Sequence, residues 1–82
     1  MMNKDEVFTL LKNEIMAVLP LAKEQDITAD HRLVDLGANS IDRSEIVINC
    51  MTNLNIKLDP LTLASLKNIG DLLDALYQAT NR

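Results

Sequence analysis

Residues 36–44 read LGANSIDRS, and this stretch predicts a turn that opens into a helix. Within it, the adjacent residues Asn39 and Ser40 are both suited to cap a helix N-terminus, although a single side chain is enough for this. If Asn39 is the cap, Asp42 falls in the first turn, near the free amides and the positive end of the helix dipole. If Ser40 were the cap, the third residue of the helix would be Arg43 instead of Asp42, and a cation is unfavourable at this positive end of the helix dipole. The sequence favours Asn39 as the cap by about 0.5 kcal/mol, which leaves the Ser40 hydroxyl free.

The helix that follows, over 40–54, carries apolar residues on two opposite sides. With about 100° of rotation per residue, one arc forms the natural core face and holds Ile46, Val47, Cys50, Met51 and Leu54. Almost opposite lie Ile41 and Ile48, together with Ser44, Glu45 and Thr52. Two outward isoleucines beside charged neighbours indicate a docking surface, although Ile41 could instead pack against the preceding loop.

The rest of the chain predicts an all-α four-helix bundle, with three longer helices, one short helix and a long loop between the first two, as one domain over 1–82. The first helix covers 3–19 and stops near Pro20. The loop over 21–38 requires core anchors, for which the apolar candidates are Ile27, Leu33, Val34 and Leu36. Whether it contains a helical turn stays open. The short helix runs to about Leu66 after the cap Asp59 and Pro60, and the last helix follows the cap Asn68, with an apolar side of Ile69, Leu72, Leu73 and Leu76.

Charge and composition exclude several classes of function. The formal net charge of −4 disfavours nucleic acid and anionic membranes as partners. The single cysteine, Cys50, allows no internal disulfide, so the reducing cytoplasm is the expected compartment. The N-terminal residues contain no long apolar run, and we expect neither a signal peptide nor a membrane span.

Residues that could catalyse a reaction lack the partners that catalysis needs. His31, the only histidine, lies in the long loop with no feature that directs it to Ser40, so it is expected to be a solvated loop residue. Asp42 and Glu45 have polar neighbours, and Cys50 is expected to be a buried, inert thiol. No spacing of metal ligands and no phosphate-binding glycine loop occurs. None of these side chains is therefore expected to act as a catalytic group or as a metal ligand.

The stretch LVDLGANSIDRSEIV, residues 33–47, resembles the phosphopantetheine attachment motif of acyl carrier proteins. The likeness extends over nearly the whole chain, to the Asp-Pro helix and to the final NIGDLLDAL. It implies that a separate phosphopantetheinyl transferase attaches 4′-phosphopantetheine covalently to Ser40 and that the thiol of this arm carries acyl thioesters between enzymes. It also implies that the protein itself catalyses nothing. On this reading, partners are recognised through the second helix, with Ile41, Asp42, Ser44, Glu45 and Ile48 as docking residues and Asn39 as the helix cap.

The sequence differs from the carriers of fatty acid synthesis at two places, and these differences weaken its resemblance to that group. Asn39 stands where those carriers usually have aspartate, and the later helix segment NCMTNLN, residues 49–55, is neutral where theirs is strongly acidic. The stretch GANSIDRSEIV, residues 37–47, looks like free-standing polyketide carriers of β-branching cassettes. That likeness implies a monomer that carries malonyl or acetyl groups, with an acyltransferase, a ketosynthase-like decarboxylase and a hydroxymethylglutaryl-synthase-like enzyme as partners. The alternatives are a fatty acid or peptidyl carrier, or a helical interaction domain without a prosthetic group.

Overall fold

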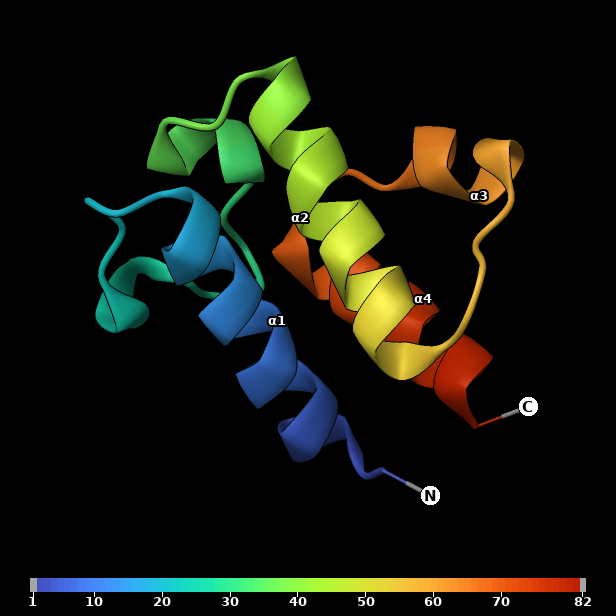
Figure 1. Ribbon diagram of the computed structural model, residues 1–82. Coiled ribbons are helices and arrows are strands. Elements are labelled where there is room, and N and C mark those ends of the chain that lie inside the picture. The colour runs from blue at the N-terminus through green and yellow to red at the C-terminus, as the bar shows by residue number, and fades with distance from the viewer. Residues whose placement is uncertain (1, 82) are drawn as a thin grey trace.

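Every regular element of the computed structural model is helical, and the structure describes residues 2–81 (Figure 1). The four α-helices are α1 (Lys4–Val18), α2 (Ser40–Leu54), α3 (Pro60–Ser65) and α4 (Ile69–Thr80). Two 3₁₀ turns, η1 (Glu24–Asp26) and η2 (Leu33–Leu36), interrupt the loop between α1 and α2. The predicted all-α, four-helix fold is thus confirmed, and the question of helical turns in the long loop is answered.

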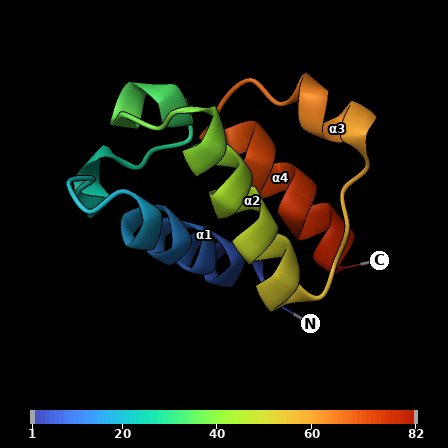
Figure 2. The same ribbon diagram turned by 45° about the horizontal axis from the view of Figure 1, so that its top comes forward.

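The core lies between the three longer helices. Helix α1 contacts both α2 and α4, and α2 also contacts α4, while the short α3 lies on the side of α2 that faces away from α1 (Figures 1 and 2). Each long helix supplies a stripe of buried apolar side chains, namely Val7, Leu11 and Ile15 from α1, Ile46 and Cys50 from α2, and Ile69, Leu72, Leu73 and Leu76 from α4. Burial of these side chains away from water is the main source of the fold's stability.

All four α-helices begin at a side-chain cap. The side-chain oxygens of Asn3, Asp59 and Asn68 accept hydrogen bonds from the backbone N–H three residues on, each at 2.8 Å, and Asn39 does the same at α2. Each cap satisfies one amide that the first helical turn leaves without a partner. The caps at Asp59 and Asn68 lie where the sequence predicts them.

The long loop is anchored, although by fewer side chains than predicted. Ile27 is buried, and Leu33 and Leu36 are partly buried against the core. The expectation for Val34 was wrong, because 45% of it is exposed. A 3₁₀ turn has about three residues per turn, so Leu33 and Leu36 share one face and Val34 points to another.

Two backbone hydrogen bonds fasten this loop to the start of α4. The N–H groups of Ile69 and Gly70 donate to the carbonyl oxygens of His31 and Ala29, at 2.8 and 2.9 Å. A Cβ added at Gly70 would lie 3.0 Å from the Ala29 Cβ, so glycine permits this close approach. The loop that leads into α2 is therefore held at a fixed position on the bundle.

Helix α2 has the two faces that its sequence predicts. Ile46 and Cys50 are fully buried, and Val47 and Leu54 are partly buried against the core. Met51 lies at the edge of this face, where its Sδ accepts a hydrogen bond from the Leu58 N–H at 3.3 Å. The opposite face of α2 is open to solvent.

Candidate functional site

The start of α2 is closed by Asn39 together with Asp42. The Asn39 Oδ1 accepts from the Asp42 N–H at 2.8 Å, and the Asp42 Oδ2 accepts from the Asn39 N–H at 3.1 Å. This reciprocal pair is a capping box, which satisfies two amides at once. The cap is therefore at Asn39, as the sequence favours, and the Asp42 carboxylate is engaged in it.

Ser40 is the first residue of α2 and is exposed. Within residues 2–81, its hydroxyl has no hydrogen-bond partner, because the neighbouring Asn39 does the capping. The chain just before it is fixed by two features: Gly37 ends η2 in the left-handed region at φ 91°, and Ala38 is buried with 3% exposure. Ser40 thus presents an unoccupied hydroxyl at a defined position on the surface.

The outer face of α2 continues from Ser40 along the helix. Ile41 is 77% exposed and Ile48 is 54% exposed, and Ser44 and Glu45 between them are also exposed. The alternative in which Ile41 packs against the long loop is wrong. The structure therefore brings the predicted docking residues onto one surface, with Asp42 half-buried at its margin in the helix cap.

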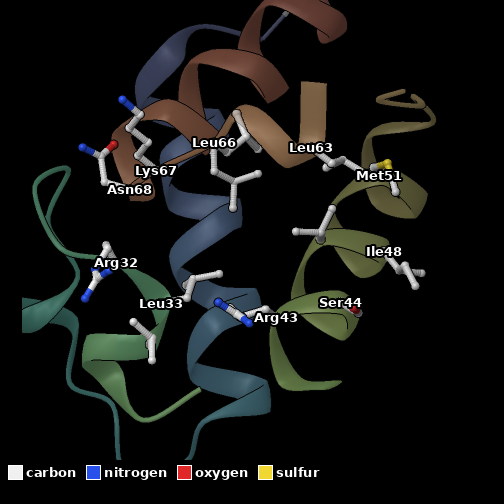
Figure 3. Close-up of a pocket in the computed structure, with 13 residues that line it drawn as sticks. Arg32, Leu33, Arg43, Ser44, Ile48, Met51, Leu63, Leu66, Lys67 and Asn68 are labelled. Carbon is white, nitrogen blue, oxygen red and sulfur yellow. The ribbon is translucent and has the colours of Figure 1, made fainter. Parts of the chain in front are cut away.

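An open groove of about 810 Å³ runs beside this face, between α2, η2 and the segment that includes α3 and the start of α4 (Figure 3). Its lining is largely apolar, and Ser44 and Ile48 of the outer face form part of its edge. The apolar lining residues are Leu33, Val34, Val47, Ile48, Met51, Leu63, Leu66 and Leu72. Periodicity along one helix could not reveal this groove, because its walls come from segments far apart in the sequence.

Other reactive side chains are engaged elsewhere or buried. Burial, together with a smaller contribution from the nearby Glu14 carboxylate, raises the pKa of the Cys50 thiol to about 12, so this thiol stays protonated at neutral pH. The His31 Nδ1 lies 2.7 Å from the Asp26 carbonyl oxygen and 3.0 Å from the Thr28 Oγ1, within its own loop. The Asp35 pKa is lowered, chiefly because its carboxylate accepts the Arg32 N–H at 2.8 Å. In the described range, no group of three or more His, Cys, Asp or Glu side chains could hold a metal ion.

Comparison with known sequences assigns this site to a family. Residues 9–76 match the family model described as the phosphopantetheine attachment site. The polyketide biosynthesis acyl carrier protein AcpK of Bacillus subtilis is 37% identical over 76 residues, which cover 93% of each chain. The chain belongs to the acyl carrier protein family. The acyl carrier proteins of Thermotoga maritima and Cyanidium caldarium are 28% and 25% identical, over 89% and 99% of this chain and 90% and 94% of their own.

Membership of the acyl carrier protein family establishes the cofactor, the carrier role and the general kinds of partner. The cofactor of the family is phosphopantetheine, and the protein is a carrier rather than an enzyme. Acyl carrier proteins interact with a phosphopantetheinyl transferase and with biosynthetic enzymes. No helix in the described part of the chain is long and apolar enough to cross a membrane.

Proposed function

We propose that Ser40 is the residue to which 4′-phosphopantetheine is covalently attached and that the protein carries acyl groups on this arm between polyketide biosynthesis enzymes. The observation that carries the proposal is the exposed, unpartnered Ser40 hydroxyl at the start of α2, within the match to the phosphopantetheine attachment family. The bound arm would supply a terminal thiol, on which acyl groups are held as thioesters. The whole of 1–82 would act as one carrier domain, as a monomer in the cytoplasm.

The residues around Ser40 fit an attachment site for such an arm. The capping box of Asn39 and Asp42 holds the helix start, so the Ser40 hydroxyl needs no internal partner and stays open to a modifying enzyme. Buried Ala38 fixes the chain on the other side. The groove that starts one helical turn further on, at Arg43 and Ser44, offers an apolar lining to an arm or to a short acyl chain.

The outer face of α2 is the surface through which partners would recognise the protein. Ile41 and Ile48 supply exposed apolar anchors, and Glu45 supplies a negative charge that steers the protein toward basic enzyme surfaces. Ser44 lies between them with a small, exposed side chain, and Asp42 adds a second negative charge at the margin of this face. We propose these five residues as the docking surface.

The pathway proposal rests on similarity. The relative of Bacillus subtilis bears the name of a polyketide biosynthesis carrier, and residues 37–47 resemble carriers of β-branching cassettes. We therefore propose malonyl and acetyl groups as cargo. The corresponding partners would be an acyltransferase, a ketosynthase-like decarboxylase and a hydroxymethylglutaryl-synthase-like enzyme.

Intact mass after incubation with a phosphopantetheinyl transferase and coenzyme A tests the attachment site. We expect one phosphopantetheine addition on the wild type, none on Ser40→Ala, and an undiminished addition on the matched control Ser65→Ala, which removes an exposed serine outside the docking surface. An addition that persists in Ser40→Ala would overturn the assignment of Ser40. No addition on the wild type would favour the interaction domain without a prosthetic group.

Loading of the modified protein then tests the cargo. We expect a malonyl-specific acyltransferase to load the arm of the wild type. Preferential loading of an amino acid by an adenylation enzyme would instead identify a peptidyl carrier, and transfer of long fatty acyl chains would identify a fatty acid carrier.

A further inference from the structure

The groove beside α2 is positively charged although the protein is acidic overall. The chain has twelve carboxylates against eight lysines and arginines, yet the groove lining includes Arg32, Arg43 and Lys67 and not one carboxylate. Three cations and no carboxylates thus line one groove, and this favours an anionic group as its occupant.

Of these three cations, Arg43 is the one that both lacks an ion pair within the described residues and extends toward the groove. Arg32 forms an ion pair with Asp35, in which Nη2 and Oδ1 lie 3.6 Å apart. Figure 3 shows the ammonium of Lys67 pointing away from Arg43, whereas the Arg43 side chain extends from α2 toward the space between α2 and η2. Within the described residues Arg43 has no ion pair, and the carboxylate of its neighbour Asp42 is held in the helix cap.

Arg43 also lies close to Ser40. It follows Ser40 by three residues in α2, so the two side chains are neighbours on the helix surface, with Cβ atoms about 5–6 Å apart. Any group bonded to the Ser40 Oγ is therefore within reach of the Arg43 guanidinium. A phosphodiester bears a negative charge at neutral pH, and arginine binds phosphate oxygens through its planar fork of N–H donors.

We propose that Arg43 binds the phosphodiester of the arm attached to Ser40 and thereby turns the arm into the groove. This inference rests on the proposed function of Ser40. The groove extends along α2 from Ser44 to Met51, a distance of about 10 Å at the rise of an α-helix. With its phosphate held on the groove side of the helix, the arm runs along the apolar lining rather than into solvent over Glu45. Arg43 is a positioning residue that orients the arm at its point of attachment.

Methyl NMR spectra of the protein with and without the arm, and without any acyl group, test this proposal. The shift of the Leu63 and Leu66 methyl resonances on modification reports how much of the arm occupies the groove. In Arg43→Gln we expect this shift to fall, by at most about fivefold, because an exposed ion pair changes the equilibrium constant between bound and free arm by about 1.4- to fivefold. Arg43→Lys, which keeps the charge, should retain most of the shift, and about 1 M salt should reduce the wild-type shift toward that of Arg43→Gln.

Lys23→Gln is the matched control, because it removes an exposed cation that does not line the groove. It should leave the methyl shifts unchanged, and intact mass must first show that every variant bears the arm. Failure to load the arm at Ser40 would count against the proposed function, whereas equal shifts in wild type and Arg43→Gln would overturn this inference alone. A shift that arises only when the arm carries an acyl group ending in a carboxylate would also overturn it, because Arg43 would then bind the cargo.

Discussion

The two faces of α2 show how one helix can separate stability from function. The inner face places Ile46 and Cys50 in the core without any exposed surface. The outer face carries Ser40, Ile41 and Ile48 into solvent, and none of these side chains is needed to fill the core. We infer that the inner face maintains the fold, while the outer face is open to change by modification or by contact with partners.

The largest expected difference between the two faces is in stability. Ile46→Ala removes fully buried methyl groups and should lower the free energy of unfolding by about 2–5 kcal/mol, measured by urea denaturation. Ile48→Ala, on the exposed outer face of the same helix, should change the free energy of unfolding by no more than about 0.5 kcal/mol. Equal losses at the two positions would contradict the division between the faces.

A second difference appears at alkaline pH. The pKa of the buried Cys50 thiol is raised from 9.0 to about 12, so above pH 9 the unfolded chain loses this proton while the folded protein keeps it. The stabilising contribution of the protonated thiol is complete below pH 9 and falls by about 1.4 kcal/mol per pH unit above it. The difference in unfolding free energy between wild type and Cys50→Ala, measured at about pH 8 and about pH 10, isolates this effect from the titration of other groups. A difference that is the same at both pH values would show that the thiol ionises in the folded protein.

The helix cap lies between the two faces and should have an intermediate effect. Asn39→Ala removes the acceptor for the Asp42 N–H and should cost about 1 kcal/mol of stability in urea denaturation. Asn39→Asp keeps a side-chain acceptor at the cap and adds a favourable charge near the helix N-terminus, so it should restore the stability. If Asn39→Ala has wild-type stability, the capping box does not hold the start of α2.

The outer face should respond to substitution in function alone. Ile48→Glu places a charge on an exposed anchor of the proposed docking surface, so we expect weaker turnover by partner enzymes and a melting temperature within a few degrees of the wild type. Lys23→Glu, at an exposed position away from α2, is a control with a larger change in charge and should leave the turnover unchanged. If the melting temperature of Ile48→Glu collapses, Ile48 is a structural residue and the docking assignment is wrong.

Local features of this fold could be predicted from the sequence, and long-range features could not. The caps Asn39, Asp59 and Asn68 are defined by a few consecutive residues, and the alternation of faces on α2 follows from helical periodicity. The predicted bounds of the first and third α-helices differ from the structure only at their ends: α1 begins one residue later and stops one residue earlier than predicted, and α3 stops one residue earlier. These elements depend on interactions within about one helical turn, which the sequence shows directly.

The features that were missed depend on contacts between distant segments. Val34 has an apolar side chain, but its exposure is decided by the 3₁₀ geometry of η2 rather than by its own chemistry. The groove brings together Arg32, Arg43 and Leu66 from three separate segments of the chain, and no period in the sequence links them. Its positive charge could therefore be recognised only once the chain was folded.

Equilibrium unfolding of Ser40→Ala, measured beside its intact mass after treatment with the transferase, tests the central claim most directly. Ser40 is exposed and its hydroxyl is not used by the fold, so the variant should keep the wild-type free energy of unfolding to within about 0.5 kcal/mol and gain no phosphopantetheine. If the variant is still modified, or if it escapes modification only because it has lost its stability, the separation of a structural inner face from a functional outer face is contradicted.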